Sequence, residues 1–199
     1  VSTTVSRTYR EEVSGHESIY ENLDKFHGVV NGIDPDIWDP ANDDFLPRYF
    51  DEHECNDGKA AARAALCAHS NIPNKTEAPM IGIVTRLTTQ KGIHLIKHGI
   101  MRSLERGCQV VMLGSAPDPE VQQSFDQMFH ELKQGYHDFM CFHLYYNEPL
   151  SHLIYAGADM ILVPSMFEPC GLSQLIAMRY GTVPIVRRTG GLNDTVFDY

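Results

Sequence analysis

The sequence predicts an α/β fold, in which a Rossmann-like, doubly wound parallel sheet is covered by helices on both faces. Two observations predict it. Short apolar runs alternate with longer amphipathic stretches through the middle and the end of the chain, and the connections between them are short. Strands that alternate with helices over short connections form βαβ units, which build parallel sheets buried on both sides.

The first third of the chain is less regular. Residues 3–13 are expected to form one helix and residues 27–30 a strand, which the turn-forming run 31–35 follows. Residues 36–57 are rich in Asp, Asn, Pro and His, a composition that predicts a long loop. Residues 58–69 have the alanine-rich composition of a helix.

The regular alternation begins at residue 80. Apolar runs predict strands at 80–84, 109–113, 139–144, 160–163 and 183–186. Helices are expected between and after them, at 93–104, 121–132, 150–156 and 172–180. Pro184 weakens the prediction of the last strand, because proline cannot donate to a sheet ladder. Sheets of this kind bind ligands beyond the carboxyl ends of their strands, so the polar residues after each strand are the candidates for chemistry.

Composition excludes several classes of protein. The chain has 199 residues and a net charge of −10, whereas a general nucleic-acid binder needs a basic surface. No apolar run approaches the ~20 residues of a membrane span. The five cysteines form no CxxC pair, which argues against a disulfide framework or a zinc ribbon and fits a reducing compartment. We therefore expect no nucleic-acid partner, no membrane partner and no metal site.

The first candidate site is the loop at residues 85–92, after the first strand of the alternating part. Arg86 and Lys91 lie in this loop, which opens a helix whose N-terminus offers free N–H groups and the positive end of a dipole. Arginine offers a planar fork to phosphate oxygens and lysine a point charge, so the loop predicts an anion site. The alternative is a solvated loop with two surface cations.

The second candidate site follows the strand at 160–163. Glu168 is able to accept hydrogen bonds from sugar hydroxyls, and Gly171 permits close approach of the main chain to a ligand. The alternative for Glu168 is a carboxylate that only stabilises a helix start. Cys170 sits where a helix N-terminus would lower a thiol pKa, but the sequence fixes no histidine beside it, so an inert or main-chain role is expected.

Other patterns carry less information. Gly190 and Gly191 follow the last strand and by themselves indicate a turn. His94 and His98 have the i, i+4 spacing of metal ligands, but no carboxylate of an HExxH motif and no third ligand accompany them, so a non-metal role is expected. His152 either lines the expected cleft or packs inside the domain.

Four motifs in order resemble one enzyme family. They are NGIDPDIWDP (31–40), GIVTRLTTQKG (82–92), LSHLIYAGADMILVPSMFEPCGLSQL (150–175) and RRTGGLNDTV (187–196). Together they resemble the family of bacterial glycogen synthases and plant starch synthases. The motif sequences are most similar to those of the plant and algal soluble starch synthases, especially class III. The resemblance runs across nearly the whole chain.

The resemblance implies a two-domain GT-B fold with the active site between two Rossmann-like halves. Residues 1–29 are similar to the tail of the N-terminal, acceptor-side domain and the hinge. Residues 30–199 are similar to the C-terminal nucleotide-sugar-binding domain, incomplete at its C-terminus. Because the chain opens without Met, we expect a fragment whose partner is the missing N-terminal domain of the same polypeptide.

The resemblance also assigns roles to residues. Arg86 and Lys91 match the basic pair on the ADP diphosphate, and Glu168 matches the glutamate on glucose hydroxyls; these three form the expected catalytic set. Tyr146 matches the aromatic that stacks on adenine, although the neighbouring Tyr145 leaves the register open. The remaining substrate-binding set is Cys170 and Gly171, through main-chain N–H groups, Leu172 and Ser173, near the distal phosphate, and Gly190 and Gly191.

The implied activity is a starch synthase that transfers glucose from ADP-glucose to the non-reducing end of an α-1,4-glucan, with retention of configuration and no cofactor. The implied location is the plastid stroma, in a chloroplast or amyloplast. The alternatives are a bacterial-type glycogen synthase, which would be cytoplasmic, and a non-catalytic module that binds nucleotide or glucan. A doubly wound domain for another nucleotide is disfavoured because the sequence lacks G-x-G-x-x-G.

Overall fold

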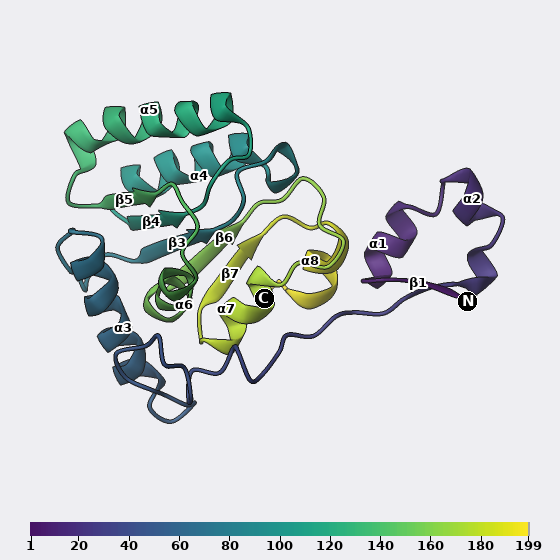
Figure 1. Cartoon of the computed structure of the whole chain (residues 1–199), viewed down its shortest axis with the longest axis horizontal. Helices are drawn as coiled ribbons and strands as arrows, with labels where there is room; N and C mark the ends of the chain where they lie inside the picture. Colours follow the sequence, from purple (N-terminus) through teal and green to yellow (C-terminus); the bar gives the residue numbers. More distant parts are fainter. Residues whose placement is uncertain (199) are drawn as a thin grey trace.

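A computed structural model of the chain, which describes residues 1–198, has a parallel five-stranded sheet at its centre (Figure 1). The strands are β3 (Met80–Val84), β4 (Gln109–Leu113), β5 (Met140–His143), β6 (Met160–Val163) and β7 (Val183–Val186). Their order is β5-β4-β3-β6-β7, and all neighbours are parallel. The chain therefore winds outward in both directions from β3 and β6, which confirms the doubly wound prediction. Between these two strands lies the switch point, where such sheets bind ligands.

Helices cover both faces of the sheet. On one face lie α4 (Ile93–Glu105) and α5 (Pro119–Tyr136). On the other lie α3 (Cys55–His69), α6 (Glu148–Gly157) and α7 (Ser173–Arg179). Figure 1 shows the two layers on opposite sides of the strands.

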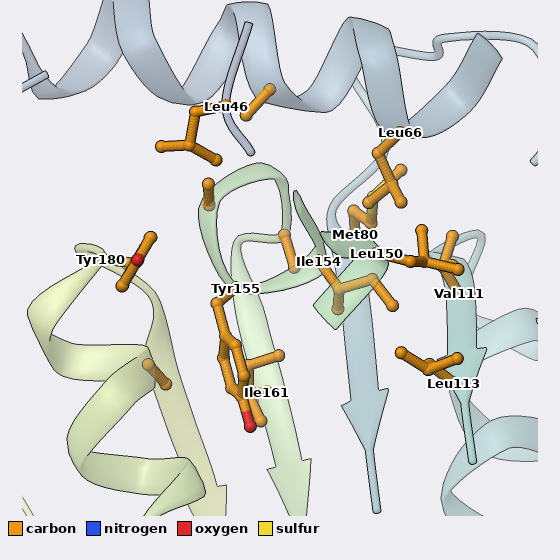
Figure 2. Close-up of a cluster of buried hydrophobic side chains, with 14 of the residues drawn as sticks. Leu46, Leu66, Met80, Val111, Leu113, Leu150, Ile154, Tyr155, Ile161 and Tyr180 are labelled. Carbon is orange, nitrogen blue, oxygen red and sulfur yellow. The ribbon is translucent and has the colours of Figure 1, made fainter. Parts of the chain in front are cut away.

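The core divides in the same way, because successive side chains of a strand point to opposite faces. Val110 and Met112 of β4 pack under α4 and α5, whereas Val111 and Leu113 pack toward α3 and α6. Figure 2 shows the second cluster, with Leu66 of α3 above the side chains of α6 and the sheet. The sheet thus places its carboxyl ends, where the candidate loops begin, on a scaffold buried on both sides.

Most predicted elements are confirmed, and their ends are set by local signals. Pro184 is accommodated because β7 is an edge strand, where a missing N–H costs little. The helix expected at 121–132 is longer, beginning at Pro119 in its first turn after the cap Asp118. The helix expected at 150–156 begins earlier, at Glu148, because the side chain of Asn147 accepts from the N–H of Leu150 at 2.9 Å.

The prediction of one helix at 3–13 is wrong. Strand β1 (Ser2–Thr4) pairs with β2 (Phe26–Gly28), and only Arg7–Glu12 form the helix α1. Ser6 is extended, with φ −164°, and its hydroxyl caps the N–H of Tyr9. The strand at 2–4 exists because of its partner 24 residues later, which local sequence does not reveal. A short helix α2 (Glu17–Tyr20) and a 3-10 turn (Leu23–Lys25) complete this segment.

The turn expected at Gly190 and Gly191 is instead the beginning of a short helix, α8 (Gly190–Thr195). Helix α1 lies beside α8, and this pairing attaches residues 1–28 to the rest of the molecule (Figure 1). The two helices cap each other: Asp194 accepts from the N–H of Thr8 at 2.9 Å, and Glu12 accepts from the N–H of Gly190 at 2.8 Å. The domain division at residue 29 stays a prediction.

In residues 1–198 no helix is both long and apolar enough to cross a membrane. All five cysteines are free thiols.

Candidate functional site

The loops that follow β3 and β6 are joined at the switch point of the sheet. The N–H of Met166 donates to the carbonyl of Gln90 at 2.8 Å. Gly92 has φ +73°, and a Cβ there would lie 2.5 Å from the carbonyl oxygen of Pro164. Only glycine fits this conformation and this close approach, so the two loops that the sequence singled out form one surface.

Lys91 and Glu168 meet on that surface. The Lys91 ammonium lies 2.5 Å from Oε2 of Glu168, and the hydroxyl of Ser165 donates to the same oxygen at 2.9 Å. The Glu168 side chain is only 8% exposed, so water does little to stabilise its charge, and the Lys91 ammonium compensates that charge instead. Both bonds end on Oε2, which leaves Oε1 able to accept from a ligand hydroxyl.

Arg86 belongs to the same loop but has a different environment. It is exposed, and its guanidinium makes no hydrogen bond or ion pair with any residue between 1 and 198. A guanidinium with no hydrogen bond or ion pair in this described part of the chain is available to a phosphate or another anion.

A pocket of about 290 Å³ opens next to Arg86, between the carboxyl ends of β3 and β4 and the start of α6. Its walls combine aromatic and aliphatic side chains with a few polar groups, the usual composition of a small-molecule site. The lining residues include Trp38, Val84, Arg86, Leu113, Ser115, Tyr145, Tyr146, Asn147, Tyr155, Ser173 and Ile176.

Tyr145 and Tyr146 both line the pocket, and they differ in how far neighbouring residues fix the side chain. The Tyr145 hydroxyl lies 3.1 Å from Nδ1 of His143, whose Nε2 lies 3.0 Å from the hydroxyl of Ser70. Tyr146 is 82% exposed. Tyr145 is therefore fixed in the wall, whereas Tyr146 is free to lie against a ligand, as the resemblance expects.

Burial raises the pKa of the Cys170 thiol, and the N–H of Asn31 opposes this only in part. A thiol with a raised pKa is a poor nucleophile, which agrees with the expected inert role. Gly171 beside it has φ +74°, and a Cβ there would lie 2.5 Å from Oε1 of Gln174. The glycine therefore shapes the turn into α7.

The other predicted residues divide into two groups. Leu172 is exposed at the start of α7, and Ser173, the first residue of that helix, lines the pocket. Gly190 and Gly191 are buried, and their N–H groups are already bound, by Glu12 at 2.8 Å and by the carbonyl of Glu168 at 2.9 Å. These glycines pack beneath the Glu168 loop; their role in binding substrate stays a prediction.

Sequence reasoning did not single out Trp38 or Tyr155 as pocket residues. The one signal was the isolated tryptophan in a loop rich in Asp and Pro. His152 is 1% exposed and packs against Trp38, which decides for the packing role. Among residues 1–198, no group of three or more His, Cys, Asp or Glu side chains is arranged to hold a metal ion.

The model of the family "Glycosyl transferases group 1" matches residues 68–199, about two thirds of the chain. The chain belongs to this family. In this glycosyltransferase, the matched region contains the whole sheet, the Lys91–Glu168 pair and most of the pocket wall.

Its relatives are starch and glycogen synthases. It is 60% identical over 99% of its length to soluble starch synthase 3, chloroplastic/amyloplastic, of Solanum tuberosum, and 44% identical over 98% to a glycogen synthase of Protochlamydia amoebophila. The catalytic domain of starch synthase IV from Arabidopsis thaliana, bound to ADP and acarbose, superposes on it with a TM-score of 0.93 at 46% identity.

The chain spans only part of these proteins: 16% of the potato enzyme, 42% of the bacterial one, and 41% of the starch synthase IV chain, of which it matches 98% of its own length. The superposition confirms the expected C-terminal half of a GT-B glycosyltransferase.

Proposed function

We propose that this chain is the donor-binding half of a starch synthase, which transfers glucose from ADP-glucose to an α-1,4-glucan. One observation carries the proposal. A lysine paired with a buried carboxylate, and an arginine that has no partner among residues 1–198, lie at the switch point of the sheet, beside a pocket walled by aromatic side chains. The two cations suit an anionic leaving group, the carboxylate suits a sugar, and the aromatic pocket suits a planar base.

The division of the donor over the site follows from the chemistry of each surface. Arg86 and Lys91 provide the cations for the diphosphate, and Oε1 of Glu168 accepts from a glucose hydroxyl. The aromatic pocket takes the adenine, with Tyr146 able to stack on it. The identity to a starch synthase whose structure holds ADP supports this assignment.

Glucose transfer breaks the bond between the anomeric carbon and the ADP oxygen, so negative charge grows on the diphosphate. Fixed cations at that position stabilise the transition state more than the ground state. Glu168 is held by Lys91 and Ser165, an arrangement suited to a hydrogen-bond acceptor rather than to a nucleophile. We therefore propose front-face displacement with retention: the acceptor hydroxyl oxygen bonds to the anomeric carbon on the face that ADP leaves, and the departing ADP takes up the proton of that hydroxyl. A covalent glucosyl adduct trapped on Glu168 in a complete enzyme would contradict it.

For the acceptor and the location, the support comes from the relatives alone. Three plant starch synthases of type 3 are 57–60% identical to the chain and a probable starch synthase 4 is 46% identical, all named chloroplastic/amyloplastic, whereas bacterial glycogen synthases are 42–44% identical. We propose a plastid enzyme that elongates starch. The alternative is a glycogen synthase of a bacterial type, located in the cytoplasm.

The test is calorimetric titration of the chain with ADP, ADP-glucose and UDP-glucose. We expect binding that favours the adenine nucleotides and that weakens about 10- to 100-fold in Arg86→Ala and in Lys91→Ala, because each removes a charge-assisted contact to phosphate. Arg106→Ala is the matched control: this arginine is exposed at the far end of α4 and should leave the affinity unchanged.

A folded chain that binds none of the three ligands would refute a preformed donor site. Equal weakening by Arg106→Ala would show that net charge, and not the site, governs affinity. Preference for UDP-glucose would remain consistent with a glycosyltransferase but would exclude ADP-glucose as the donor.

A further inference from the structure

Trp38 is the sole tryptophan of the chain and lines the pocket from a loop remote in sequence. It lies between β2 and α3, before the region that the family model matches. The remainder of the wall comes from the carboxyl ends of the strands and from α6 and α7. The loop therefore adds an indole to a wall whose other aromatic side chains, Tyr145, Tyr146 and Tyr155, come from the Rossmann scaffold.

The indole is held firmly. It stacks on the ring of His152 with 4.1 Å between centroids and 14° between planes, and Tyr155 meets it edge-on at 5.7 Å. Stacked and edge-on contacts of this kind fix the orientation of an aromatic ring. The position of Trp38 in the pocket is thus set by α6, which carries both partners.

His152 is itself fixed by a buried polar contact. Its Nδ1 lies 2.7 Å from Oδ2 of Asp43, and the hydroxyl of Tyr180 donates to the same oxygen at 2.5 Å. Both the imidazole and the carboxylate are almost fully buried. Asp43 belongs to the same loop as Trp38, so the loop is tied to α6 twice, once by stacking and once by this contact.

We infer that Trp38 is a specificity-determining residue that selects a purine over a pyrimidine in the nucleotide pocket. The inference rests on the proposed function, because it assigns the base of the same donor. A wall that is rigid before binding loses little entropy when a ligand arrives. A two-ring base covers more of such a wall than a one-ring base does, so the indole favours adenine over uracil.

The first test needs no variant, because the emission of the single tryptophan reports on this wall alone. ADP and adenosine should each change the tryptophan emission, and the midpoint for each ligand should equal the one that calorimetry gives for the same ligand. Inorganic pyrophosphate, which has no base, should bind without this change. UDP should produce a smaller change and weaker binding.

The second test compares substitutions by calorimetry, with thermal unfolding to verify folding. Trp38→Leu should weaken ADP about tenfold, the size expected for the loss of one base–aromatic contact, while pyrophosphate affinity stays the same. Trp38→Phe should keep most of the affinity because it retains a flat ring. Tyr49→Leu is the matched control, an exposed aromatic of the same loop outside the pocket lining.

The outcomes separate the two proposals. If ADP binds with unchanged tryptophan emission and Trp38→Leu keeps the ADP affinity, the inference is wrong and the donor site stands. If ADP and pyrophosphate lose affinity equally in Trp38→Leu, the residue acts on folding or on the whole site and the inference is also wrong. If neither ligand binds the folded chain, the donor site fails and the inference with it.

Discussion

At the residue scale, His143 shows how the wall of the pocket depends on a buried neutral imidazole. Burial, together with the nearby His69, lowers its pKa from 6.5 to about 4. The ring lies between the hydroxyls of Ser70 and Tyr145, so it joins the end of α3 to the pocket. A neutral ring both donates and accepts in such a chain, whereas a protonated ring only donates.

This pKa predicts that the protein loses stability in mild acid. Between pH 6.5 and about 4 the unfolded chain binds a proton at this position that the folded chain excludes, so the free energy of unfolding falls as the pH falls. The expected loss is about 2 kcal/mol across this window. Urea unfolding of the wild type at several pH values measures it.

A matched pair of variants assigns the effect. His143→Phe should flatten the pH dependence between 6.5 and 4, whatever it does to stability at neutral pH. His53→Asn removes an exposed histidine and should leave the slope unchanged. The same slope in His143→Phe as in the wild type would place the titrating group elsewhere.

At the element scale, the pairing of α1 with α8 connects the N-terminal segment to the loop of Glu168. Asp194 accepts from the N–H groups of Arg7 and Thr8, at 2.6 and 2.9 Å, and so acts as a cap from another helix. Burial would raise the pKa of Asp194, but the hydrogen bonds from Thr8 and Arg7 outweigh it, and the pKa is lowered. The carboxylate is therefore charged when it caps α1.

Removal of this cap should loosen α1. We expect Asp194→Ala to lower the free energy of unfolding by about 1 kcal/mol, the usual cost of a lost cap, and to speed amide exchange in residues 7–12. Asp198→Ala, which removes an exposed carboxylate paired with Arg188, is the control. Equal effects of both substitutions on α1 exchange would contradict the capping role.

At the scale of the whole molecule, the site described here is open to solvent, with Arg86 and Tyr146 exposed at its rim. The chain spans 41% of the starch synthase IV chain on which it superposes, and water reaches its site freely as long as nothing faces it. We expect the chain by itself to bind ADP-glucose but to incorporate no measurable glucose into a glucan primer. Incorporation of labelled glucose that Lys91→Ala abolishes would contradict this.

The sequence determined the regular part of the molecule because its signals are local. The buried strands from Met80 to Val163 are continuous apolar runs, and the polar residues that follow them fall at one edge of a parallel sheet by topology. Arg86, Lys91 and Glu168 were therefore identified as candidates without any knowledge of their contacts. The prediction of one helix at 3–13 was wrong because β1 depends on a partner strand rather than on its own residues.

Only the tertiary structure decided which side chains meet. The Lys91–Glu168 pair joins residues 77 positions apart. The stack of Trp38 on His152 joins a loop to a helix, and no local pattern in either segment predicts that contact. The same is true of the Glu12 carboxylate, which occupies the N–H of Gly190 across 178 residues. Periodicity and turn residues specify elements because they act over a few positions, whereas a binding site is formed by packing, which brings distant residues together.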